Sequence, residues 1–197
     1  MFSAFDADPA SFVARFTEGL RLMKACWTEP SITFAGRFWQ IDGAAMEPKP
    51  FQKPYPPLWI GGSHPAAVRR AIQYGNGFFG AGRSTTAQFA QQVHVLRAAL
   101  AEAKQDPSTF QIAKRVYIVI DDDTTRARER VDAGLKRIYG VSGLTTIAVY
   151  GSPSACIKGL REVADAGAEL IQFHLLIDDA EQMERLATEV ISEVQNE

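Results

Sequence analysis

The sequence has few of the residues that mark disulfide-bonded, metal-binding or membrane proteins. Two cysteines, Cys26 and Cys156, and three histidines are scattered over 197 residues, which gives neither a disulfide framework nor metal-ligand spacing. No apolar run approaches the roughly 20 residues of a membrane span. The acidic N-terminus also lacks the basic flank and apolar core of a secretion signal. We therefore expect a cytoplasmic protein in which both cysteines are buried small apolar side chains.

An excess of charge of either sign is also missing. The formal net charge of −2 and the pI of about 6.0 argue against nucleic-acid or membrane-surface partners. Hydrophobic residues make up 46% of the chain and charged residues 22%, which is typical of a soluble globular protein. The length suits one core, so we expect residues 1–197 to form a single domain.

Residues 1–57 predict a helix, a hairpin and an extended connection. Apolar residues recur at helical spacing over residues 9–28, until Glu29-Pro30 ends the pattern. Residues 31–42 alternate around Gly36, which indicates a short hairpin. Five prolines between residues 48 and 57 exclude a helix or a central strand there, so this segment is expected to run over the surface.

Residues 58–197 predict strands that alternate with helices. We expect strands at residues 58–60, 78–79, 111–120 and 170–175, with helices over residues 65–75, 85–104, 124–139, 152–166 and 179–195. Residues 144–150 fit either helix or coil. Connections too long for hairpins imply an α/β fold with parallel strands and right-handed crossovers. Four strands are too few for a closed barrel of eight, so the sheet is either open or half of a larger barrel.

The stretch from Pro48 to Ser63, PKPFQKPYPPLWIGGS, resembles the middle of the luciferase-like monooxygenases. In that family a proline-rich connection leads into the fifth strand of a TIM-type barrel and a Gly-Gly turn. Further segments fit in the same order, namely Gly36–Trp39, Ala71–Gly77, Asp122–Arg128 and Gly151–Ser154. The resemblance covers nearly the whole chain. It implies a partial TIM-type (β/α) barrel whose four strands are equivalent to strands 5–8.

The resemblance also implies that the first four barrel strands lie outside this sequence. In the family those strands carry much of the isoalloxazine pocket and the usual proton-handling residues. No catalytic residue is therefore assigned to this chain.

The strongest candidate for ligand binding is the turn Gly61–Gly62–Ser63–His64. Glycines let a backbone approach an oxyanion, and a helix N-terminus presents free N–H groups to it. A plain strand-to-helix turn, capped by Ser63 or His64, is the alternative that the residues alone leave open. The resemblance implies that Gly61, Gly62 and Ser63 lie near the cofactor phosphate, and His64 at the same rim could also bond it.

Arg83 and His174 are expected at the same rim of the sheet, where barrel enzymes keep their sites. Arg83 either binds a phosphate bidentately or is a solvated surface arginine. His174 either faces the barrel mouth or packs at the rim. His94 lies within a helix and is read as structural, and Asp121–Asp123 are expected to cap the helix that follows them.

Two classes of function follow from the resemblance. The first is a flavin- or deazaflavin-dependent oxidoreductase that binds FMN or F420 and acts on a small organic substrate. The second is a non-catalytic half-barrel that binds a flavin or phosphate ligand or self-associates, and exposed strand edges would favour a homodimer. A truncated product of a longer gene is a third hypothesis.

Overall fold

The computed structural model describes residues 8–194 of the chain. Contacts within the chain divide it into two compact units, one ending at Leu58 and the other beginning at Trp59. This boundary lies within one residue of the predicted change from proline-rich connection to β/α segment. A single domain over residues 1–197 stays a prediction. The acidic start of the chain and the predicted end of the last helix, at residue 195, lie outside the described residues.

The first unit contains the predicted helix and hairpin. A 3-10 turn, Pro9–Ser11, leads into helix α1, Phe12–Thr28. Strands β1, Ile32–Ala35, and β2, Gln40–Ala44, then pair antiparallel. Residues 48–57 form neither helix nor strand, as the prolines predicted.

The hairpin of the first unit is tied to α1 by one buried carboxylate. Glu18 accepts hydrogen bonds from the backbone N–H groups of Arg37 at 3.1 Å, Phe38 at 2.8 Å and Trp39 at 3.1 Å. Although burial opposes the shift, these bonds hold the pKa of Glu18 below its usual value. A side chain at Gly36 would collide with the Glu18 carboxylate, so the Gly-Arg-Phe-Trp segment is shaped around it.

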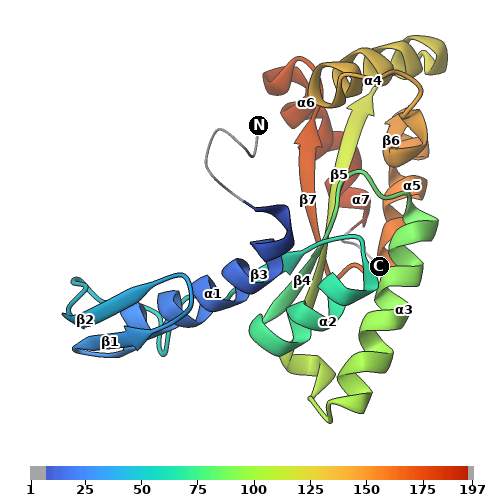
Figure 1. The fold of residues 1–197 in the computed structure, drawn as a ribbon. Helices are drawn as coiled ribbons and strands as arrows, with labels where there is room; N and C mark the ends of the chain where they lie inside the picture. The colour runs from blue at the N-terminus through green and yellow to red at the C-terminus, as the bar shows by residue number, and fades with distance from the viewer. Residues whose placement is uncertain (1–7, 195–197) are drawn as a thin grey trace. The chain divides into compact units, whose positions relative to one another are not determined.

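The second unit contains the four predicted parallel strands (Figure 1). They are β3, Trp59–Gly61, β4, Gly77–Gly80, β5, Gln111–Ile120, and β7, Leu170–Leu175. β3 pairs with β4, β4 with β5, and β5 with β7, all in parallel register. The α/β fold with about four parallel strands is therefore confirmed.

A fifth strand lies in the segment that the sequence left undecided. Residues 145–147 form a 3-10 turn, and β6, Ala148–Gly151, pairs with residues 117–120 of β5. Because β7 follows β5 along residues 113–118, β4 and β6 must share the opposite edge of β5. β4 ends opposite Lys114 and β6 begins opposite Tyr117, so β5 extends well beyond the end of β4.

Helices connect the strands of the second unit and follow β7. They are α2, Pro65–Tyr74, α3, Thr86–Glu102, α4, Thr124–Tyr139, α5, Pro153–Asp165, α6, Asp179–Arg185, a π-helical stretch, Leu186–Ile191, and α7, Ser192–Val194. The predicted final helix is thus interrupted by a π-helical stretch. Within residues 8–194, no helix is both long enough and apolar enough to cross a membrane.

Alternate residues of β5 enter two different cores. Val116, Ile118 and Ile120 pack against α5 and the π-helical stretch. Tyr117 and Val119 pack against α4, which lies at the carboxyl end of β5 (Figure 1). The side chains of residues 113 and 115 therefore lie on the same face of β5 as Tyr117 and Val119, and α4 covers this face only near the carboxyl end of the strand.

The cysteines differ in burial. Cys156 lies in the α5 core, where burial raises the pKa of its thiol to about 12. Cys26 is only half-buried, so its expected burial is not complete.

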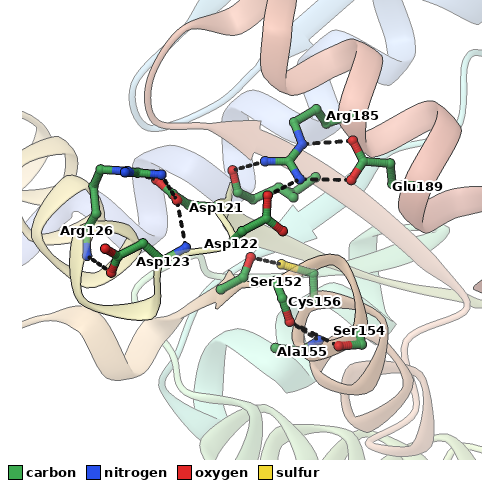
Figure 2. A network of polar contacts seen from close by, with 12 residues as sticks. Asp121, Asp122, Asp123, Arg126, Ser152, Ser154, Ala155, Cys156, Arg185 and Glu189 are labelled. Carbon is green, nitrogen blue, oxygen red and sulfur yellow. Dashed lines mark hydrogen bonds and ion pairs between the residues drawn. The ribbon is translucent and has the colours of Figure 1, made fainter.

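The carboxyl end of β5 is held by one amide side chain and by ion pairs, of which Figure 2 shows that of Asp121 with Arg126. The buried Asp121 pairs with Arg126 at 2.6 Å and with Arg130 at 3.1 Å. The Gln182 amide accepts from the Ile120 N–H at 2.7 Å and donates to the Ile120 carbonyl at 3.0 Å, so it replaces a neighbouring strand.

The predicted capping role of the aspartate run is confirmed for Asp123 alone, which accepts bonds from the N–H groups of Thr125 and Arg126. Asp122 instead pairs with Arg185 at 3.2 Å, and Arg185 also binds Glu189 at 2.8 Å (Figure 2).

We expect Gln182→Leu to lower the free energy of unfolding by about 2 kcal/mol, because the buried Ile120 N–H loses its acceptor. Urea unfolding followed by circular dichroism measures the change. Gln73→Leu, at an exposed position of α2, is the matched control and should leave stability nearly unchanged. Equal stability of the two variants would contradict the strand-like role of Gln182.

Candidate functional site

The Gly61–His64 turn requires glycine at its second position. Gly62 has a φ of 153°, and a Cβ there would lie 2.6 Å from the Cβ of Ala67. At Gly61 a Cβ would lie 3.0 Å from the carbonyl oxygen of Phe79 on β4. The backbone of the turn therefore lies directly against α2 and β4, with no room for side chains.

The first turn of α2 has no free N–H group to offer a ligand. His64 caps the helix: its Nδ1 accepts from the Ala66 N–H at 3.1 Å, and its carbonyl accepts from Ala67 at 2.8 Å and Val68 at 3.3 Å. Pro65 has no N–H. The structure therefore selects His64, not Ser63, as the cap. It also corrects the expectation that the helix N-terminus would present free donors.

The free donors lie in the turn itself. The backbone N–H groups of Ser63 and His64 have no hydrogen-bond partner among residues 8–194. The Ser63 side chain is exposed, so its hydroxyl adds a third donor. Successive backbone N–H groups in a turn are a common anion-binding arrangement. The residues present fit a phosphate group.

A second turn, Gly80–Ser84, lies beside the first. Ser63 and Ser84 line the same cavity of about 330 Å³, together with residues of α2 and α3. Thr85 begins α3 with a capping box, in which its hydroxyl accepts from the Gln88 N–H and the Gln88 side chain bonds the Thr85 N–H. The two turns that contain the predicted site residues are therefore brought together at one rim of the sheet.

A buried lysine that the sequence analysis missed supports the second turn. Lys114, on β5, is 2% exposed, and its Nζ donates to the Ser84 carbonyl at 2.8 Å. The ammonium also lies 5.4 Å from the centre of the Phe89 ring. No carboxylate pairs with it in the part of the chain that the structure describes, and burial lowers its pKa to about 8. Lys114 thus fixes the position of the Ser84 backbone.

Polar side chains gather on the face of β5 opposite Lys114. Arg115 pairs in register with Gln172 of β7, and Tyr117 pairs with His174. The Arg115 Nε donates to the Gln172 Oε1 at 3.4 Å, and the ring of His174 lies 5.0 Å from that of Tyr117. We call Arg115, Tyr117, Gln172 and His174 the polar face. His174 therefore points to this face and not into the helix-covered core.

Arg83 lies next to the polar face. Its guanidinium carbon lies 5.4 Å from the centre of the Tyr139 ring, and the Tyr139 hydroxyl lies 2.7 Å from that of Tyr117. Burial and this hydrogen bond raise the pKa of Tyr139 to about 12, while the charges of Arg115 and Arg83 oppose the shift. Arg83 is exposed and makes no ion pair within residues 8–194.

His94 is exposed on α3, and its structural role stays a prediction. Across residues 8–194, no three His, Cys, Asp or Glu side chains are grouped so as to hold a metal ion.

The model of the luciferase-like monooxygenase family matches residues 1–142. Among curated proteins, the chain is 30% identical over 154 residues to an FMNH(2)-dependent dimethylsulfone monooxygenase of Pseudomonas putida, an alignment that covers 78% of the chain and 38% of that protein. It is 26% identical over 117 residues to an F420-dependent glucose-6-phosphate dehydrogenase of Nakamurella multipartita, an alignment that covers 59% of the chain and 34% of that protein. The chain spans less than two fifths of these relatives.

Solved structures with the same fold include the monooxygenase RslO1 from Streptomyces bottropensis, with a TM-score of 0.81 and 19% identity. That alignment covers 98% of this chain and 64% of the other. An F420-dependent secondary alcohol dehydrogenase has a TM-score of 0.78 and 20% identity, and that alignment covers 91% of this chain and 61% of the other. The partial-barrel fold is confirmed by this similarity.

We expect the stability of the wild type relative to Lys114→Met to rise with pH between about 8 and about 10.5. In this window the unfolded lysine holds its proton while the buried one has lost it, so the penalty for burying a charge disappears. Urea unfolding at a series of pH values measures the difference. Lys136→Met, which removes an exposed lysine, controls for the loss of one positive charge. A difference that stays constant with pH would contradict a charged, buried Lys114.

Proposed function

Because the chain belongs to the luciferase-like monooxygenase family, we propose that it is the C-terminal half-barrel of a flavin- or deazaflavin-dependent oxidoreductase that acts on a small organic substrate. The observation that carries the proposal is the Gly61–His64 turn, in which the free N–H groups of Ser63 and His64 lie at the carboxyl end of β3. Barrel enzymes bind their ligands at this end of the strands.

The cofactor is FMN or F420, since relatives of both kinds match the chain. Its phosphate is bound by the N–H groups of Ser63 and His64 and by the Ser63 hydroxyl, and Gly61 and Gly62 allow the backbone to approach. Arg83, on the neighbouring turn, adds a positive charge beside the phosphate. When bound, the cofactor would supply the redox chemistry, and the protein would supply binding, orientation and electrostatics.

Self-association is the second function that an observation favours. Among the described strands, β3 pairs only with β4, and β7 only with β5, so each has one edge without a neighbour. Unpaired edges of a parallel sheet are normally covered. We propose a homodimer that covers them, with or without catalysis, and a cytoplasmic location in which the reduced cofactor is available.

We expect the purified chain to bind FMN or F420, measured by fluorescence titration with the mass in solution recorded at the same time. FMN should bind at least about tenfold more tightly than riboflavin, which lacks the phosphate. Ser63→Ala should weaken FMN binding by about tenfold, because one donor is lost. Replacing Gly61 and Gly62 by valine should abolish it.

Ser142→Ala, at an exposed serine away from the turn, is the matched control and should bind FMN like the wild type. Equal affinity for FMN and riboflavin, or unchanged binding in the Gly61 and Gly62 variants, would remove the phosphate assignment. Failure of both FMN and F420 to bind would favour the non-catalytic alternative.

A further inference from the structure

Arg115 is a half-buried cation without an anion. Its Nε makes the long bond to Gln172, but its two terminal amino groups have no hydrogen-bond partner within residues 8–194. Near the carboxyl end of β5, by contrast, Arg126 of α4 and Arg185 of α6 are both paired with aspartates. Half-buried charges are normally paired, because partial loss of water is costly for an ion.

The side chain of Arg115 is packed against neighbouring residues. A Cβ at Gly82 would lie 3.0 Å from the Arg115 Cδ and 3.0 Å from the Tyr117 hydroxyl, so the second turn lies directly on both residues. The guanidinium carbon lies 5.9 Å from the centre of the Phe79 ring. Glycine at position 82, Phe79 and Gln172 together restrict the rotamers that Arg115 can adopt.

The charge on this face has one sign. None of the four strands β3, β4, β5 and β7 contains an aspartate or a glutamate, whereas Arg115 lies on the polar face and Arg83 borders it. Tyr117, Tyr139 and His174 are the other titratable groups there. An organic anion would therefore meet attraction and no repelling carboxylate.

We propose that Arg115 binds the carboxylate or sulfonate group of the organic substrate, with the apolar part of the substrate against Phe79. The planar fork of a guanidinium matches the paired oxygens of such groups, and the two unpaired amino groups supply the donors. This inference rests on the proposed function, in which the polar face is the substrate side of the site.

The position of Arg115 separates this anion from the cofactor phosphate. β5 lies two strands away from β3, and neighbouring strands are about 4.8 Å apart, so Arg115 starts about 10 Å from the Gly61–His64 turn. The turn has its own donors for a phosphate. Two anionic groups, one on each ligand, can therefore be bound at the same rim.

Calorimetric titration of the full chain with benzoate, benzenesulfonate and the neutral benzamide tests the proposal. We expect both anions to bind the wild type at least about tenfold more tightly than benzamide. Arg115→Gln should weaken benzoate binding by about tenfold or more, and Arg115→Lys, which keeps the charge without the fork, should weaken it less. Arg128→Gln, at an exposed arginine of α4, makes the same charge change and should bind like the wild type.

Equal affinity for benzoate and benzamide, no binding of benzoate to the wild type, or unchanged binding in a folded Arg115→Gln variant would overturn the proposal. Titration of the same variant with FMN and riboflavin separates the two sources of an anion. If Arg115→Gln weakens FMN but not riboflavin, the arginine serves the cofactor phosphate and the substrate assignment is wrong. If FMN fails to bind the wild type while benzoate binds through Arg115, the proposed cofactor function fails on its own.

Discussion

Strand β5 must satisfy its backbone hydrogen bonds on both edges while its side chains enter cores on both faces, and this requirement arranges the rest of the second unit. β7 follows one edge, and β4 and β6 share the other. The pairing with β7 ends at Ile118, and at Ile120 the Gln182 amide takes the place of β7. Buried backbone groups without partners are costly, so a polar side chain in an apolar core is stabilising here.

Asp121, the residue after Ile120, is also a buried polar group that needs partners. Asp121 is 2% exposed and would be a costly isolated charge, but Arg126 (Figure 2) and Arg130 bind it from the following helix. The hydrogen bond from Arg126, with a contribution from Asp123, holds the pKa of Asp121 below its usual value even though burial opposes the shift. The carboxyl end of β5 is thus fixed next to the candidate site.

Much of this architecture could be predicted because it depends on short-range patterns. The apolar runs at residues 58–60 and 170–175, the prolines of residues 48–57 and the Asp123 cap all have local physical causes. β6 could not be assigned, because Ala148–Gly151 becomes a strand by pairing with Tyr117–Ile120 of β5, a contact that is distant in the sequence. The π-helical stretch at Leu186–Ile191 likewise has no signal in residue spacing.

The candidate site was predictable only in outline. Glycines at positions 61 and 62 indicated a close approach of the backbone, but which N–H groups are free depends on the His64 ring, which bonds its own helix. Lys114 and Arg115 were missed, although a signal existed. Two adjacent basic residues within an apolar strand must point to opposite faces, so one enters the helix-covered core and the other the opposite face.

The shared edge of β5 limits how a site of this kind can change during evolution. The chain leaving β4 opposite Lys114 must turn away before β6 begins opposite Tyr117, and the Ser84 carbonyl is held by Lys114 within that interval. Insertions at residues 81–84 would meet β6 along the same edge, so loop lengthening, the usual source of new specificity in barrels, is blocked at this position. Diversity in ligand recognition would instead have to arise by substitution at fixed positions.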